Sequence, residues 1–448
     1  MNIYSTTRRR ASIATVRALS IALPLSLTLA ACQDASKILE QEAPSRVEAG
    51  TLDQPQHAQL LVNSAIGDFE CALGQYIIAT GLTGDELQDA QLSQSGWDYD
   101  RRTIFTGFIA YGSAQCGSTQ VPGLYTPLSV ARYQADNALR KLQGWTDAQV
   151  PNRQSLIAQA ATYAGYSLEL LGEAFCSAAI DLGPEMTRAQ LFTEAESRFS
   201  TAITAAQAAN NATMLNAARI GRARARLNLA STLTGTAAAA KLAEARTDAA
   251  AVTDANFVLN ASYSSTVTRR ENLAWTQMNR GLYSTVDPSY RNLTWLGTPD
   301  PRVPVIDAAV NGHDNITRIW RQTKYAAIGS PIPIARYAEA QLIVAEADLA
   351  ATGNTTTAVN IINALHAKAG IPPYAGGTAA EVKAQIIEER RREFFLEGQR
   401  FGDIIRYDLT VVPVKGTNFK SGGTYGNDKG IQVCFPLPDV ERNNNPNI

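Results

Sequence analysis

Aromatic and charged side chains alternate in the stretch 95–102, Ser-Gly-Trp-Asp-Tyr-Asp-Arg-Arg. Trp97 and Tyr99 supply apolar ring faces, and Arg101 supplies hydrogen-bond donors. A sugar ring presents an apolar C–H face that stacks on such rings, whereas its hydroxyl groups need polar partners nearby. The stretch therefore predicts a sugar-binding surface that uses Trp97, Tyr99 and Arg101.

Further rings concentrate in two segments that show little helical periodicity. They are Tyr111, Trp275, Tyr283, Tyr290, Trp295 and Trp320. Among these, we expect Tyr290 and Trp295 to contribute to ligand binding. The alternative for every ring is that it anchors a long loop on the scaffold, because aromatic side chains bury large areas.

Catalysis was considered for the carboxylates of Asp98 and Asp100, since glycoside hydrolysis uses a pair of acidic residues. Both lie on one short segment, where carboxylates are usually solvated, and nothing marks either as an acid with a raised pKa. The sequence has no Gly-x-Ser-x-Gly elbow, Walker loop or Rossmann glycine pattern. His57, His313 and His366 are isolated. We expect no catalysis, metal or cofactor.

Residues 1–31 are typical of an export signal. A basic segment that includes Arg8–Arg10 precedes an apolar stretch over 18–31, which is too short to span a membrane. Small residues then lead directly into Cys32, as in the lipidation motif of bacterial lipoproteins. We expect a lipid anchor on Cys32 and a polar tether over residues 32–50.

Four further cysteines make an even number, as expected in an oxidising compartment: Cys71, Cys116, Cys176 and Cys434. They permit three pairings, among which we favour a Cys71–Cys116 disulfide. The alternative for Cys176, which lies in an apolar helical pattern, is a buried free thiol.

Alanine-rich segments with apolar residues at three- and four-residue spacing predict a mainly α fold. The expected helices cover about 54–80, 127–143, 153–180, 188–209, 212–231, 236–252, 333–351, 355–369 and 379–407. Small residues alternate with large ones in these segments, which indicates tetratricopeptide-like helix pairs: 153–180 with 188–209, 212–231 with 236–252, and 333–351 with 355–369.

We expect one domain over residues 51–448, in which this helical scaffold carries long irregular inserts at about 81–126 and 253–332. Such inserts on a rigid scaffold are the usual place for binding residues. The tail after residue 408 predicts loops with short strands near Val411–Val414 and Ile431–Phe435.

The charge balance excludes some partners. Forty Lys and Arg residues oppose 41 Asp and Glu residues, for a net charge of −1. A chain without net positive charge has no long-range attraction for a polyanion, so we expect no nucleic-acid binding. No apolar run after residue 31 approaches the length of a membrane-spanning helix.

The C-terminal third contains four distinctive motifs: Arg336–Leu342, Ile362–Pro372, Ile387–Arg400 with Asp403 and Arg406, and Phe435–Pro438. Together these motifs resemble the RagB/SusD family of nutrient-binding outer-membrane lipoproteins. The resemblance implies helix pairs with an irregular binding region. It also implies a non-catalytic, surface-exposed lipoprotein that captures an oligosaccharide or another nutrient. Such a protein delivers its ligand to a SusC-like TonB-dependent barrel in the outer membrane.

Two other interpretations remain open on the sequence. The first is a tetratricopeptide-type lipoprotein that acts as a scaffold for envelope protein assembly. The second is a secreted glycosidase on a helical fold.

Overall fold

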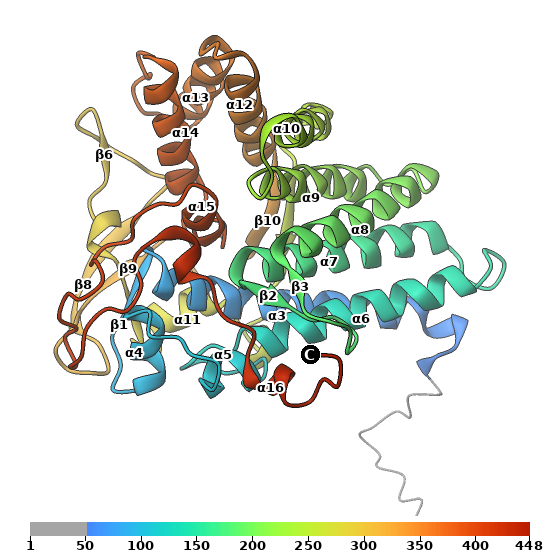
Figure 1. The fold of residues 1–448 in the computed structure, drawn as a ribbon, viewed down its shortest axis with the longest axis horizontal. Helices are drawn as coiled ribbons and strands as arrows, with labels where there is room; N and C mark the ends of the chain where they lie inside the picture. Colours follow the sequence, from blue (N-terminus) through green and yellow to red (C-terminus); the bar gives the residue numbers. More distant parts are fainter. Residues whose placement is uncertain (1–51) are drawn as a thin grey trace, which may run out of the picture. The chain divides into compact units, whose positions relative to one another are not determined.

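Helices dominate the computed structural model, which describes residues 52–448 (Figure 1). The longer helices are α3 (Ala58–Thr83), α6 (Tyr125–Gly144), α7 (Arg153–Ala174), α8 (Arg188–Ala208), α9 (Ala212–Ala230), α10 (Gly235–Ala250), α12 (Tyr337–Thr352), α13 (Thr356–Ala369) and α14 (Ala379–Glu393). The shorter helices are α4 (Gln94–Asp100), α5 (Ile109–Ser113), α11 (Leu273–Asn279), α15 (Arg400–Arg406) and α16 (Asp439–Arg442). The prediction of a mainly helical fold is confirmed. The expected signal, tether and Cys32 lie outside the described residues.

Short strands pair two by two, and all of the pairs are antiparallel. They are β1 (Leu87–Asp89) with β5 (Ser284–Val286), β2 (Ser177–Ala178) with β3 (Met186–Thr187), β4 (Val258–Ala261) with β10 (Ile332–Arg336), β6 (Thr294–Trp295) with β7 (Thr298–Pro299), and β8 (Val305–Asn311) with β9 (Arg318–Gln322). Within residues 52–448, no helix is long and apolar enough to cross a membrane.

Local chemistry explains where several helices begin. Thr187 and Thr378 each accept a hydrogen bond from the backbone three residues on, at Gln190 and Glu381, whose side chains bond back. These capping boxes satisfy amide groups that the first turn of α8 and of α14 would otherwise leave unpaired. At the far end of α12, Gly353 adopts a φ of 67°, which terminates the helix without steric cost.

Small residues allow the helices to pack closely, as the tetratricopeptide-like pattern predicts. The Phe199 ring of α8 lies where a side chain on Gly165 of α7 would approach within 2.8 Å, and it also faces Gly221 of α9. Phe192 occupies the equivalent place against Gly172 of α7. The predicted pairs α7–α8, α9–α10 and α12–α13 each pack together, so the repeat-like scaffold is confirmed.

A buried ion pair joins two of these helices, α9 and α12. Arg224 of α9 donates to both carboxylate oxygens of Glu339 on α12, at 2.5 and 2.7 Å, and to the Ile334 carbonyl at 2.8 Å. The Glu339 carboxylate is fully buried, and the buried Glu169 and Glu173 of α7 lie within the electrostatic reach of Arg224. This cluster is the polar centre of the scaffold.

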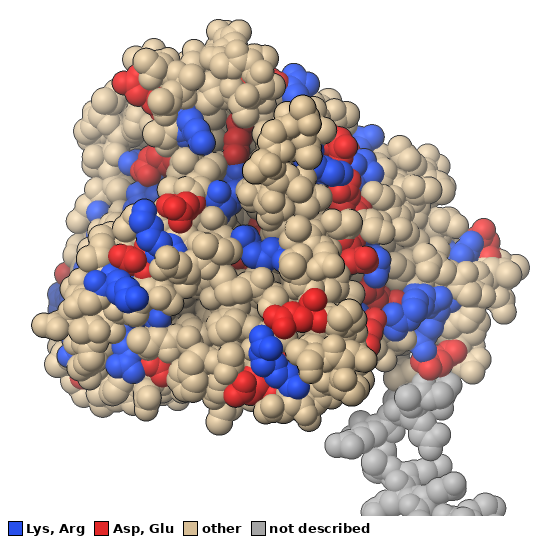
Figure 2. Space-filling model, viewed as in Figure 1, with Lys and Arg blue, Asp and Glu red and all other residues tan. Residues whose placement is uncertain are grey.

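The charged run after residue 387 is also held in ion pairs rather than open to a ligand. Arg302 bonds Asp300 and Glu389, while Lys324 donates to Glu397 at 2.7 Å. Arg400 pairs with Asp85 at 2.6 Å. Most partners lie far away in the sequence, so the run fastens segments of the fold together. On the face of the protein that Figure 2 shows, Lys and Arg residues are interspersed with Asp and Glu residues.

One helix is shorter than predicted, because the chain leaves it two residues before Cys176, which forms a disulfide. We expected a helix over 153–180, but α7 ends at Ala174, after which Phe175 pairs with Phe435 in a parallel bridge. The Cys176 amide donates to the Phe435 carbonyl at 2.9 Å, and Cys176 forms a disulfide with Cys434. The alternative of a free thiol at Cys176 was therefore wrong. Cys71 is joined to Cys116, the pair we favoured.

Another predicted helix is broken in two. We expected one helix over 379–407, but the chain leaves helical geometry between α14 and α15. Leu396 has a φ of 54° and Gly398 a φ of 82°, and the Leu396 amide donates to the buried Glu86 carboxylate at 2.8 Å. A side chain on Gly398 would press against Tyr76 and Ile77 at 3.2 Å. The break lets this segment pack directly on α3.

The tail lacks the predicted strands. Around 411–414 the structure has only an isolated bridge between Thr410 and Lys429, and residues 430–433 form a 3₁₀-helix. Val412, Val414 and Ile431 are exposed, and Pro413 has no amide hydrogen to donate to a strand ladder.

Candidate functional site

The two irregular inserts meet, because β1 of the first pairs with β5 of the second. Directly beyond this pair, the Ala90 amide donates to the Tyr283 carbonyl at 2.9 Å, and the Ala90 carbonyl accepts from the Asp314 amide at 3.0 Å. The His313 amide donates to the Leu282 carbonyl at 3.0 Å. We call the surface formed by residues 90–97, 281–283 and 312–314 the insert junction.

Partly exposed rings characterise the insert junction. Trp97 of α4 is half-buried, and its indole Nε1 donates to the Gln91 carbonyl at 2.8 Å, which fixes the orientation of the ring. Tyr283 is half-buried and lies beside the exposed His313 imidazole, with ring centroids 5.5 Å apart. Leu92 is also exposed, at 65%. These groups offer apolar ring faces beside hydrogen-bonding edges, which is the chemistry that sugar rings require.

Buried acids lie behind this surface. Lys420 donates to the Asp314 carboxylate at 3.1 Å, to Thr317 Oγ1 at 2.6 Å and to the Asp89 carbonyl. Burial raises the pKa of Asp89 to about 7, and it raises the pKa of Asp100 to about 7 as well. Lys420 therefore fastens the C-terminal tail to the two inserts, close to buried carboxyl groups whose pKa lies near neutral pH.

Arg101 lies at the edge of the junction with most of its donors already engaged. Its Nε and Nη2 donate to Asp98 Oδ1 at 3.1 and 2.7 Å, and Nη1 donates to the Gly422 carbonyl at 3.2 Å. Its side chain is 18% exposed. Arg101 thus holds α4 against the tail, and only a small part of it faces solvent.

Tyr99 does not take part in the surface, contrary to our expectation. It is fully buried, its hydroxyl donates to the Pro122 carbonyl at 2.6 Å, and its ring packs edge-on against Phe108 and Phe435. In the short helix α4, Trp97 and Tyr99 project in different directions, so one ring is half-exposed while the other enters the core.

Tyr290 and Trp295 were also expected to bind ligand, and neither belongs to the junction. Tyr290 is fully buried, stacked on Phe395 and covered by Arg391. Trp295 is half-buried in the β6–β7 hairpin, where it packs edge-on against His366 at 5.0 Å. Figure 1 shows β6 beside α14, well separated from α4. Both rings therefore pack on the scaffold and anchor their loops there.

Tyr283, His313 and Lys420 were not predicted from the sequence as members of one site. Tyr283 was noted only as one ring among several, and His313 only as an isolated histidine. The approach of Tyr283 and His313 to the segment that carries Trp97 depends on the pairing of β1 with β5, which short strands without clear alternation do not reveal.

The residues considered for catalysis are not arranged as an acid–base pair. Asp98 accepts from Arg101 and from Thr103 Oγ1 at 2.6 Å, whereas Asp100 is buried and accepts from the Asp89 amide at 2.8 Å. No cluster of three or more metal-ligating side chains occurs between residues 52 and 448.

A scaffold of helix pairs that presents half-exposed rings on joined loops is typical of a ligand-binding protein. Residues 182–448 match the model of the SusD family, and the chain belongs to that family. It is 27% identical over 169 residues to the starch-binding protein SusD of Bacteroides thetaiotaomicron, a match that covers 35% of this chain and 30% of that protein.

Solved structures show the same fold over most of the chain. A SusD-like carbohydrate-binding protein from Bacteroides vulgatus aligns with a TM-score of 0.65 and 17% identity, over 88% of this chain and 97% of that one. A surface glycan-binding protein A from Bacteroides uniformis aligns with a TM-score of 0.64 and 15% identity, over 88% and 98%.

Proposed function

We propose that this protein is an outer-membrane lipoprotein, anchored through Cys32 and exposed at the cell surface, that binds an oligosaccharide at the insert junction. It delivers this ligand to a SusC-like TonB-dependent transporter. The protein has no catalytic role.

The observation that supports the proposal is the pairing of β1 with β5, together with the backbone bonds of Ala90 to Tyr283 and Asp314. These contacts bring the segment that carries Trp97 next to the segments that carry Tyr283 and His313. The similarity to a starch-binding protein and to the structure of a surface glycan-binding protein supports a glycan as the ligand class. In this account, Trp97 and Tyr283 stack on sugar rings, and His313 bonds hydroxyl groups. Because few polar groups contact the ligand, its affinity would be low enough for release to the transporter.

Glycan binding is tested by comparing two tryptophan substitutions in the full-length chain. Affinity electrophoresis against a panel of soluble polysaccharides identifies a ligand for the unmodified protein. Trp97→Ala should then weaken binding about tenfold, because ring stacking contributes about 1 kcal/mol beyond the buried area. Trp295→Ala is the matched control, since Trp295 packs on His366 away from the junction.

If Trp295→Ala weakens binding and Trp97→Ala does not, the ligand site is misplaced. If no polysaccharide, starch included, retards the unmodified protein, glycan binding itself is contradicted.

Delivery is tested by solubilising native membranes in mild detergent and identifying proteins that co-purify with the tagged chain. A stoichiometric large β-barrel supports delivery to a transporter. Envelope-assembly proteins without such a barrel would favour the scaffold interpretation instead.

A further inference from the structure

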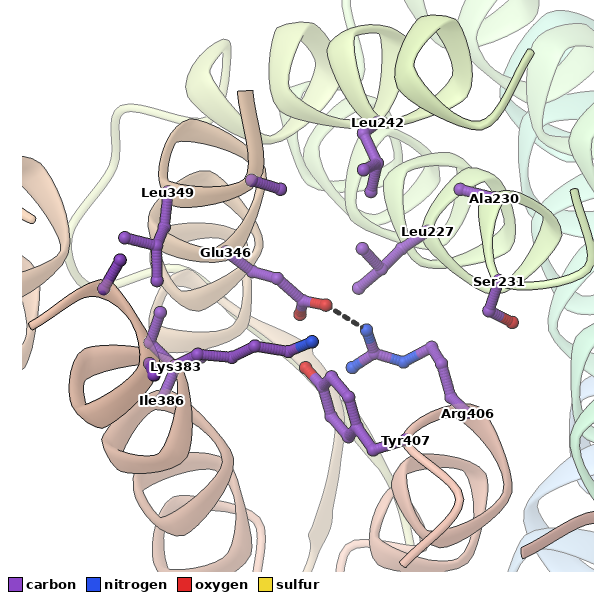
Figure 3. Close-up of a pocket in the computed structure, with 13 residues that line it drawn as sticks. Leu227, Ala230, Ser231, Leu242, Glu346, Leu349, Lys383, Ile386, Arg406 and Tyr407 are labelled. Atoms are coloured by element: carbon purple, nitrogen blue, oxygen red, sulfur yellow. Dashed lines mark hydrogen bonds and ion pairs between the residues drawn. The ribbon is translucent and has the colours of Figure 1, made fainter. Parts of the chain in front are cut away.

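A cavity of about 430 Å³ lies between the α9–α10 pair and helices α12, α14 and α15 (Figure 3). It shares no residue with the insert junction. Its exposed lining residues other than Lys383 are all small: Ser231, Ala350, Ala379 and Ala380. The volume falls in the range of small-molecule sites.

The inner walls of the cavity are apolar. Leu227 and Leu242 come from α9 and α10, while Leu349 and Ile386 come from α12 and α14 (Figure 3). Leu227 and Ile386 are 2% and 1% exposed, so the depth of the cavity suits a hydrocarbon group.

Two buried polar atoms in the cavity lack partners among residues 52–448. One carboxylate oxygen of Glu346 pairs with Arg406, but Oε2 is buried and accepts no hydrogen bond. The Tyr407 hydroxyl is likewise buried and unpaired. A native structure rarely leaves such groups unsatisfied, because each costs free energy.

A third polar group, the Lys383 ammonium, lies 6.0 Å from the centre of the Tyr407 ring and forms no ion pair within residues 52–448. Figure 3 shows the heads of Glu346, Lys383 and Tyr407 pointing toward one another, with Leu349 and Ile386 on one side of them and Leu227 and Leu242 on the other. Arg406 adds no free charge, because it bonds both Glu346 and Asp403.

This arrangement specifies the chemistry of a ligand. The unpaired Oε2 of Glu346 requires a donor, preferably a cation, and the exposed ammonium of Lys383 can donate to an anionic acceptor. Burial raises the pKa of the Tyr407 hydroxyl well above its ordinary value, so that group stays protonated and can donate to the same acceptor. The apolar walls require a hydrocarbon side chain. An ammonium and a carboxylate on one small apolar molecule satisfy all of these groups.

We propose that the cavity binds a free α-amino acid with an apolar side chain. Its ammonium donates to Glu346, its carboxylate accepts from Lys383 and Tyr407, and its side chain lies among Leu227, Leu349 and Ile386. The site is separate from the proposed glycan surface and does not depend on it.

The first test is calorimetric titration of the detergent-purified full-length chain with L-leucine and L-phenylalanine. We expect saturable one-to-one binding of at least one of them. N-acetyl-L-leucine, which lacks the ammonium, and isoamylamine, which lacks the carboxylate, should each bind at least tenfold more weakly. Equal binding of N-acetyl-L-leucine, or no saturable binding of either amino acid, would overturn the proposal.

The second test uses exposed positions, so that folding is preserved. Lys383→Met should weaken amino-acid binding about tenfold, and Ala380→Trp should abolish it by filling the mouth of the cavity. Lys368→Met on α13 is the matched control and should bind like the unmodified chain. If Lys383→Met behaves like this control, the site is wrong. Glycan binding should be unchanged in all three variants.

Discussion

The buried pair between Arg224 and Glu339 gives the sharpest prediction about the scaffold. Arg224→Met removes two short charge-assisted hydrogen bonds and leaves Glu339 fully buried without a cation. Breaking a buried pair by removing one partner costs about 3–5 kcal/mol, because the remaining charge keeps its desolvation penalty. We therefore expect the free energy of unfolding to fall by about this amount at pH 7.

The size of the protein converts this loss into a shift of the melting temperature. Residues 52–448 number 448 − 51 = 397. At about 2.1 cal/mol/K per residue, the unfolding entropy is about 0.8 kcal/mol/K, so the expected decrease is about 4–6 °C. Urea denaturation followed by circular dichroism, with calorimetry for the melting temperature, measures both quantities.

Two matched variants test the reasoning. Arg222→Met removes a cation from the same helix but should cost only about 1 kcal/mol, because Arg226 still pairs with Asp248 at 2.7 Å and no carboxylate is left without a cation. The double variant Arg224→Met with Glu339→Gln should recover part of the loss, since no charge is then buried alone. If Arg224→Met and Arg222→Met cost the same, or the double variant is the least stable, the argument from a buried uncompensated charge is refuted.

Three further predictions concern a disulfide, pH and a helix cap. Cys176→Ser should destabilise the protein by about 5 kcal/mol in non-reducing urea titrations, because the Cys176–Cys434 disulfide closes a loop across 258 positions of the sequence; a loss under 1 kcal/mol would contradict the chain-entropy argument. The pKa of Asp89 and of Asp100 is about 7 in the folded protein, which is above the value in the unfolded chain. The stability that these two groups contribute to the folded state is therefore complete below about pH 4 and is lost as the pH rises through 7. Asp89→Asn should flatten this decline in melting temperature between pH 5 and pH 8, and an unchanged slope would exclude Asp89 as a cause. Thr378→Ala should cost about 1 kcal/mol by removing the capping box of α14, whereas Thr378→Ser should restore it.

The helices could be predicted from the sequence because their periodicity is local and their ends are punctuated. Gly353 stops α12 two residues from the expected end, and the capping threonines place the starts of α8 and α14. The failures lie where distant contacts override local preference. Leu396 leaves the helix because its amide bonds Glu86 more than 300 positions away.

The candidate site shows the same division. The partial exposure of Trp97 could be predicted because its polar, glycine-flanked neighbourhood is visible in the sequence. The burial of Tyr99 could not, since it follows from rings as distant as Phe435. The association of Trp97 with Tyr283 and His313 depends on the pairing of β1 with β5, which no local pattern specifies.

Hydrogen exchange tests whether the two inserts form one ligand-binding surface. Backbone amide exchange of the full-length chain should be measured with and without a polysaccharide that binds it. We expect exchange to slow together in residues 90–97, 281–283 and 312–314. Protection confined to the β6–β7 hairpin around Trp295, or to the helix pairs, with the insert junction unchanged, would contradict it.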